Sequence, residues 1–165
     1  MLIRLAKVSL VASSACFLLI IVFNNLTDYG SNFEFVRHVL SMDTTFPGNR
    51  GMWRAMTSPI IHHVFYALII VWELVAGVLL AVATGRMWNA RAKSADVWRK
   101  ATSLAAAGLT LSLLQWLIAF IIVGGEWFLM WQSATWNGQT AAARMFIVFA
   151  LILIFLNQRD DEVAG

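Results

Sequence analysis

The chain has 165 residues, of which 60% are hydrophobic and 13% are charged, and its mean hydropathy is +0.73. Soluble domains carry about twice that share of charged residues, so this composition excludes an ordinary water-soluble fold and leaves no room for a separate soluble catalytic domain. The formal net charge of +3 does not indicate nucleic-acid binding, because the basic residues cluster at the edges of apolar segments.

Four apolar segments are each long enough to cross a bilayer as a helix. A helical span needs about 20 mostly apolar residues, because hydrocarbon offers no partner to an unpaired backbone amide. We therefore predict an all-α fold, a four-transmembrane-helix bundle, as one integral membrane domain over residues 1–165. The predicted helices cover approximately residues 8–24, 59–85, 101–125 and 140–158.

The first segment follows Arg4 and Lys7 and has a competing interpretation as a cleaved signal sequence. Residues 13–16 (SSAC) resemble the cleavage site of such a sequence. The apolar run continues beyond them from Leu18 to Phe23, which a cleavable signal would not do. We therefore expect a retained helix.

The connection over residues 25–58 is long enough to contain short helices. Ser31 and Glu34 have the spacing of a helix-capping box, and apolar residues follow with helical periodicity. This pattern predicts a short amphipathic helix on the membrane surface. A second short interfacial piece is expected over residues 52–56, after the turn signal at residues 47–49 (PGN).

The second segment begins at Pro59, and Glu73 is its only formally charged residue. A carboxylate near the middle of a bilayer costs several kcal/mol unless it is protonated, paired or hydrated, and such residues are usually functional. The spacing of His62, Tyr66 and Glu73 places them on one stripe of the helix. Two interpretations remain open: a proton or ligand path with Glu73 at its floor, or a structural carboxylate hydrogen-bonded across the bundle.

The third segment has no charged residue and presents small and polar residues on one face. That face includes Ser112 and Gln115, and Gln115 is a candidate partner of Glu73. Such faces are typical of close packing between membrane helices, with a few hydrogen bonds between them. A matching face on the first helix would comprise Ser9, Ser13, Cys16, Ile20 and Asn24.

Near the start of the fourth segment, Arg144 could have either of two roles. Its guanidinium can extend toward the outer surface and pair with Glu126 or Asp43 as a structural clamp. Alternatively, Arg144 and Arg54 together hold a lipid phosphate or another anion. The rim of this candidate anion or lipid site would comprise Trp127, Trp131, Gln132, Trp136 and Asn137.

The basic residues also predict the orientation of the chain. Residues 86–100, between the second and third segments, contain five Lys or Arg and one Asp. Lys and Arg in short loops stay preferentially on the cytoplasmic side. Because Arg4 and Lys7 fall on the same side, both termini are predicted to be cytoplasmic.

Three histidines raise the question of a haem or metal site. Adjacent His62 and His63 point about 100° apart on a helix, which makes joint binding of one ion difficult. No histidine lies in any of the other predicted spans to complete bis-histidine haem ligation, and Cys16 is the only cysteine. We therefore expect no cofactor and no metal. Covalent catalysis is not favoured either, because no serine or cysteine has a recognisable paired base.

Several short stretches of the sequence together resemble one known protein family. They are SMDTTF at 41–46, WRA at 53–55, WE at 72–73, GGEWFLMWQS at 124–133 and WNGQ at 136–139. Together they resemble an uncharacterised bacterial family of predicted small integral membrane proteins, over nearly the whole chain. The resemblance implies four helices in a bacterial inner membrane, and it supplies no activity.

The sequence favours a non-enzymatic role in the membrane. A chain with no soluble domain and no complete catalytic set is typical of an accessory or scaffold subunit that binds lipid, a larger membrane partner or a second copy of itself. A small proton-linked transporter that uses Glu73 is the first alternative. A haem- or quinone-binding redox subunit is the second.

Overall fold

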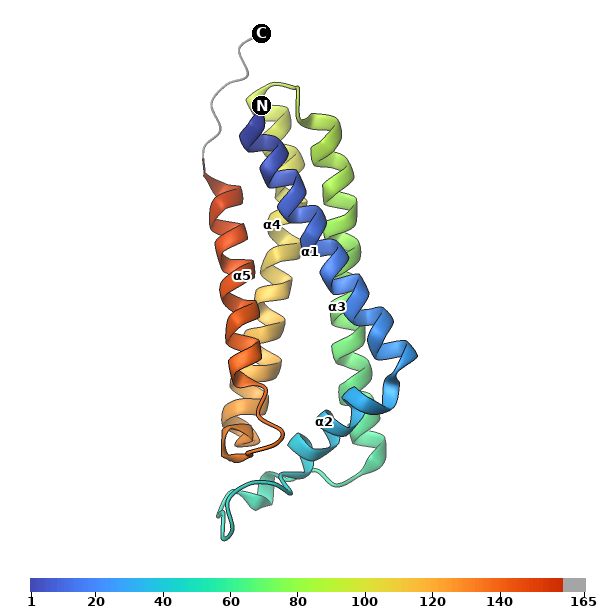
Figure 1. The fold of residues 1–165 in the computed structure, drawn as a ribbon, viewed down its shortest axis with the longest axis vertical. Helices are drawn as coiled ribbons and strands as arrows, with labels where there is room; N and C mark the ends of the chain where they lie inside the picture. Colours follow the sequence, from blue (N-terminus) through green and yellow to red (C-terminus); the bar gives the residue numbers. More distant parts are fainter. Residues whose placement is uncertain (159–165) are drawn as a thin grey trace.

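Four long helical stretches form the body of the computed structural model, which describes residues 1–158 (Figure 1). The described residues contain helices and turns but no strand, which confirms the predicted all-α class. In chain order the helices are α1 (Leu2–Thr27), α2 (Tyr29–Ser41), η1 (Met52–Arg54), α3 (Pro59–Ala90), α4 (Ala95–Gln115), η2 (Trp116–Trp127), η3 (Met130–Gln132) and α5 (Gln139–Asn157).

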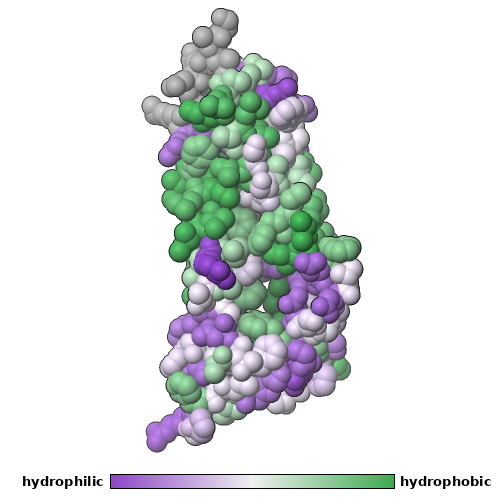
Figure 2. Space-filling model, in the orientation of Figure 1, coloured by the Kyte–Doolittle hydropathy of each residue, from purple (hydrophilic) through white to green (hydrophobic). Residues whose placement is uncertain are grey.

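Four stretches are long and apolar enough to cross a bilayer: α1, α3, the continuous run of α4 and η2, and α5. In the most hydrophobic window of each, between 17% and 39% of the residues are buried inside the chain, so most residues of each span are at least partly exposed. On the face drawn in Figure 2, hydrophobic residues cover most of the bundle between α2 and the hydrophilic residues at the far end. A surface of this kind requires hydrocarbon as its solvent, as predicted for a four-span membrane protein.

The helices extend beyond the apolar segments that predicted them. α1 begins at Leu2 rather than near residue 8, α3 continues to Ala90 rather than ending near residue 85, and α4 begins at Ala95 rather than near residue 101. Charged residues interrupt an apolar segment, but Lys and Arg are good helix formers and stay helical where the chain enters the interface. The expected ranges of these three helices were therefore too short.

Small residues let neighbouring helices approach closely. α1 packs against α3, α3 against α4, and α4 against α5. A Cβ added to Gly77 of α3 would lie 3.3 Å or less from atoms of Leu18 and Leu19 on α1. Gly108 of α4 lies against Leu80 of α3 in the same way. These contacts follow the small-residue rule for membrane helices.

A side chain at position 108 would overlap with the core. A Cβ on Gly108 would lie 2.8 Å from both Cγ and Cδ2 of Leu80, which is fully buried. Gly108→Ala is therefore expected to lower the melting temperature of the detergent-solubilised protein, although alanine favours a helix by about 1 kcal/mol over glycine. Gly85→Ala is the matched control, because no atom lies within 4 Å of a Cβ there. A Gly108→Ala protein as stable as the Gly85→Ala protein would contradict this packing.

The third span changes its winding after Gln115. Over the 12 residues of η2 the helix has π-helical turns, a form that is rare, occurs mostly as single turns and is frequent at functional sites. Gly124 and Gly125 suit this geometry, since a Cβ at either position would lie 3.2 Å from a carbonyl oxygen of the preceding turn.

Arg4 and Lys7 fasten the end of the bundle at which the N-terminus lies. The Arg4 Nη1 donates to the carbonyl oxygens of Arg91 at 3.2 Å and Lys93 at 2.6 Å, and the Lys7 Nζ donates to the carbonyl oxygen of Gln158 at 2.6 Å. Both basic side chains are 1% exposed. The start of α1, the turn between α3 and α4 and the end of α5 therefore lie together, as an even number of spans requires (Figure 1).

At the opposite end, α2 lies across the bundle (Figure 1). The predicted helix exists, but it begins at Tyr29, and the expected capping box is not formed. Ser31 lies inside the helix, while the Glu34 carboxylate accepts hydrogen bonds from Arg37. The apolar face of α2 packs into a hydrophobic cluster of the chain itself that includes Tyr66 and Phe128. A position of α2 on the lipid surface stays a prediction.

Candidate functional site

Next to α2, the structure contains a hollow of about 350 Å³ that we call the Glu73 hollow. α1, α2, α3, η2 and the start of α5 contribute to its walls. In Figure 2 the surface is hollowed between α1 and α5, near the border between its hydrophobic and hydrophilic parts. The lining residues are Ile21, Asn24, Asn25, Asn32, Phe35, Val36, Tyr66, Ile69, Glu73, Trp116, Phe120, Gly138 and Ala141.

A second, apolar hollow of about 200 Å³ lies between α2, α3 and η2. Its lining shares Phe35, Val36, Ile69 and Phe120 with the Glu73 hollow, so these side chains separate the two spaces. None of its lining residues is charged. Of the two hollows, the Glu73 hollow is therefore the one with an ionisable carboxyl group in its lining.

Glu73 is 2% exposed and is held by a chain of amides. Its Oε2 accepts a hydrogen bond from the Asn25 Nδ2 at 2.8 Å, and the Asn25 Oδ1 accepts one from the Asn32 Nδ2 at 2.8 Å. The Tyr66 hydroxyl donates to the backbone oxygen of Asn25 at 3.3 Å. The carboxyl thus connects α1, α2 and α3 through neutral groups, and no described Lys or Arg lines the hollow.

Two further polar side chains near Glu73 are left without partners. Gln115 is fully buried and does not line the hollow, and neither its Oε1 nor its Nε2 has a hydrogen-bond partner among the described residues. Trp116 is 8% exposed and lines the hollow, and its Nε1 has no hydrogen-bond partner either. A buried polar atom left unpaired costs about 1–3 kcal/mol, so the unpaired N–H of Trp116, a residue that lines the hollow, indicates a site for a polar ligand group.

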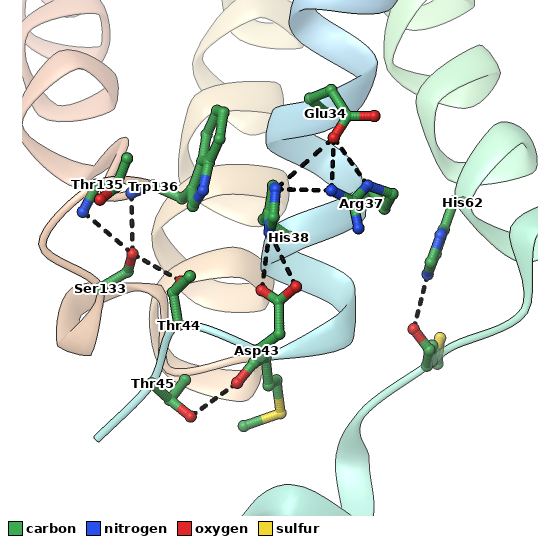
Figure 3. Close-up of polar contacts among 12 residues, drawn as sticks. Glu34, Arg37, His38, Asp43, Thr44, Thr45, His62, Ser133, Thr135 and Trp136 are labelled. Atoms are coloured by element: carbon green, nitrogen blue, oxygen red, sulfur yellow. Dashed lines mark hydrogen bonds and ion pairs between the residues drawn. The ribbon is translucent and has the colours of Figure 1, made fainter. Parts of the chain in front are cut away.

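The predicted stripe of α3 is buried at all three positions, but it is not a continuous path. His62 is 3% exposed, and its Nε2 lies 2.7 Å from the carbonyl oxygen of Met56, in the segment before α3 (Figure 3). Tyr66 bonds to α1 instead of to His62 or Glu73. His62 therefore anchors the loop, while Tyr66 and Glu73 belong to the hollow.

A polar cluster joins α2 to the loops over residues 42–58 and 128–138, which we call the outer loops because they lie at the end of the bundle away from the N-terminus (Figure 3). The His38 Nδ1 lies 2.9 Å from both carboxylate oxygens of Asp43, and the His38 Nε2 lies 2.8 Å from the Arg37 Nη2. The imidazole also stacks on Trp136, with ring centroids 4.6 Å apart. On the other side of the cluster, the Glu34 Oε2 accepts a hydrogen bond from the Arg37 Nη2 at 2.6 Å.

The hydrogen bonds from Arg37 lower the pKa of the Glu34 carboxyl, and Glu34 raises the pKa of Arg37. Because the folded-state pKa of Glu34 is lowered, this pair stabilises the fold above the ordinary carboxyl range, and the contribution is lost as the pH falls through the lowered pKa. The two side chains are 38% and 45% exposed, so solvent screening keeps the effect small.

The structure does not form the expected clamp of Arg144. This side chain is exposed on α5, and no described residue forms an ion pair or hydrogen bond with it. Asp43 pairs with His38 instead, and Glu126 is exposed. Arg54 is also separately engaged: its Nη1 donates to the carbonyl oxygen of Trp127 at 2.9 Å. The two arginines therefore have no contact in common that would make them one anion site.

The other residues predicted at that rim stabilise the outer loops. Trp131 packs edge-on against Phe46 at 5.7 Å, and the Gln132 Oε1 accepts the backbone N–H of Phe46 at 3.1 Å. Trp136 stacks on the imidazole described above. The Asn137 Oδ1 accepts the first backbone N–H of α5 at 3.1 Å. These contacts connect the first and second outer loops and do not surround a common pocket.

The three histidines are dispersed among different contacts. His38 belongs to the polar cluster, His62 binds the loop, and His63 is exposed, with its Nδ1 2.8 Å from the hydroxyl of Tyr29. Within residues 1–158, no group of three or more His, Cys, Asp or Glu side chains is arranged to hold a metal ion.

Sequence reasoning identified Glu73, Tyr66 and Gln115, but it missed Asn25, which supplies the hydrogen bond to Glu73. Asn25 lies seven residues after Leu18 and three after Val22, on the buried face of α1, but the sequence does not mark that face because apolar residues occur on both sides of the helix.

A known protein family matches almost the full chain. The family described as "Predicted small integral membrane protein (DUF2165)" matches residues 3–159. No curated protein and no solved structure matches the chain. The family match agrees with the four apolar helices and the outward-facing hydrophobic surface. This chain therefore belongs to the family of predicted small integral membrane proteins (DUF2165).

Proposed function

We propose that this protein is a non-enzymatic binding subunit of the membrane, which accepts the polar head of an amphiphilic molecule from the bilayer in the Glu73 hollow. One observation carries the proposal: the buried Glu73 carboxyl and Trp116, whose Nε1 has no hydrogen-bond partner, line the same hollow of about 350 Å³. A polar head would supply the missing hydrogen bond, and its apolar body would stay in hydrocarbon.

Binding is favoured over catalysis because the ionisable groups near the hollow are not arranged for a reaction. Glu73 is bonded to an amide and has no neighbouring nucleophile or second acid in the described lining. The His38–Asp43 pair lies in a different part of the chain and turns its second nitrogen to Arg37. As an accessory subunit, the protein would present its bound amphiphile, or its tryptophan-containing outer loops, to a larger membrane protein or a second copy.

The amphiphile itself provides the first test. Purification in mild detergent followed by native mass spectrometry is expected to find wild-type protein with a bound amphiphile. Trp116→Phe removes the indole N–H but keeps an aromatic ring, and it is expected to lower the bound fraction severalfold. Trp88→Phe, at a 49% exposed position far from the hollow, is the matched control and should leave binding unchanged. Equal retention by both variants, or an empty wild-type protein, would contradict the proposal.

We also propose that the protein lies in a bacterial inner membrane with both termini in the cytoplasm. The support is the basic segment between α3 and α4, together with the position of Arg4 and Lys7 at the same end. All three lysines (Lys7, Lys93 and Lys100) belong to this end of the bundle. A membrane-impermeant amine reagent is therefore expected to label the protein only after the inner membrane is permeabilised. Labelling from outside intact spheroplasts would reverse the orientation.

A further inference from the structure

The lining of the Glu73 hollow contains a negatively ionisable group and no positively charged one. Its described lining contains one acid and no Lys or Arg, and Asn25 and Tyr66 contribute neutral groups. The Glu73 Oε2 has an amide donor, which compensates only part of the cost of a carboxylate in hydrocarbon. A bound positive charge would compensate the rest.

Aromatic rings also line the hollow and form what we call its aromatic wall. Trp116 and Phe120 of η2 have ring centroids 4.8 Å apart, and Phe35 of α2 stacks with Phe120 at 6.2 Å. All three line the hollow, together with Tyr66 of α3. A cation within about 6 Å of such a ring is attracted by the negative face of its π-system, and the attraction strengthens away from water.

We propose that the ligand of the Glu73 hollow is an organic cation, a protonated amine on an apolar body, with its ammonium group between Glu73 and the aromatic wall. This inference rests on the proposed function. The ammonium donates to the carboxylate of Glu73, which lines the hollow. An oxygen next to the amine, such as a hydroxyl or ester oxygen, accepts the unpaired N–H of Trp116.

The same ammonium chemistry is available from a free amphiphilic amine and from the headgroup of an ethanolamine phospholipid. The headgroup also carries a phosphate. Arg144 is exposed on α5 one turn beyond Ala141, which lines the hollow, and no described residue pairs with it. It is therefore the residue to vary when the two sources are separated.

The experiment uses the full-length protein in nanodiscs of phosphatidylcholine, a lipid that has no primary amine. A photoreactive dodecylamine is the probe, and unlabelled dodecylamine and dodecanol compete with it at equal chain length. Saturable labelling is expected, with dodecylamine competing at least about tenfold better than dodecanol. Glu73→Gln should abolish this preference, while Glu73→Asp, which keeps the charge, should retain part of it. Glu126→Gln is the control, because Glu126 is exposed and outside the hollow.

The outcomes separate the two levels of the hypothesis. Equal competition by dodecanol would contradict the proposal that the ligand is a cation, but it would still support a binding site for an amphiphile. Absence of saturable labelling by any probe would overturn the proposed function as well. If adding phosphatidylethanolamine to the nanodiscs suppresses labelling, and Arg144→Gln relieves that suppression, the cation is the lipid headgroup. Suppression by dodecylamine alone identifies a free amine.

Discussion

Asn25→Ala is expected to destabilise the protein by about 2–3 kcal/mol, because it leaves the buried Glu73 carboxyl without its hydrogen-bond donor. The same substitution removes the acceptor of the Asn32 amide and thereby loosens α2 from α1. Denaturant unfolding in a mild detergent, followed by circular dichroism, measures the loss. Asn24→Ala is the matched control, since Asn24 is exposed and makes no side-chain hydrogen bond to a described residue.

A double substitution shows whether the loss comes from the unpaired acid. When both partners of a buried polar pair are replaced by apolar residues of similar size, much of the stability returns. The protein with Asn25→Leu and Glu73→Leu should therefore be more stable than the protein with Asn25→Leu alone. If the second substitution destabilises it further, Asn25 is not the group that shelters Glu73.

Arg4→Met is expected to have the second large effect, a loss of about 2 kcal/mol. Its guanidinium is buried, donates to two backbone carbonyls of the turn between α3 and α4, and lies 5.1 Å from the ring centroid of Trp98. Methionine keeps much of the volume but none of the donors. The control is Arg86→Met, because Arg86 is exposed on α3. Equal unfolding midpoints for the two variants would show that Arg4 is a topology signal without a structural role.

The four spans were predictable because hydrocarbon imposes a simple rule. A helix that crosses it must be long and apolar, and this requirement is visible in one sequence without any knowledge of the packing. Glu73 was visible for the same reason, since a lone acid stands out in an apolar run. The buried face of α4 was also predicted, because Gly108, Ser112 and Gln115 recur with helical spacing.

The buried face of α1 was predicted wrongly. Ser9, Ser13, Cys16 and Asn24 were expected to pack inside, but all four are exposed. The face that packs in the bundle includes Val11, Ser14, Leu18 and Asn25. In water, hydrophobic residues mark the buried face, but in a bilayer both faces are apolar and this signal disappears. Small or polar residue type was then the remaining guide, and it indicated the neighbouring stripe.

The outer loops could not be derived from the sequence because their contacts join distant segments. Thr44 donates a hydrogen bond to the Ser133 hydroxyl across 89 positions, and Trp136 stacks on His38 (Figure 3). The spacing of charges suggested partners for Arg144 that the loops do not bring to it. The π-helical winding of η2 had no sequence signal beyond Gly124 and Gly125, which also fit an ordinary helix end.

Mapping where a bound amphiphile contacts the chain tests the central claim most directly. A photoreactive amphiphile is crosslinked in nanodiscs, and the modified residues are identified by peptide mass spectrometry. We predict crosslinks at Phe35, Trp116, Phe120 and Ala141, on the separate elements that enclose the Glu73 hollow. Crosslinks confined to the outward-facing side chains of α5, such as Leu151 and Ile154, would show ordinary lipid contact and contradict a binding site at Glu73.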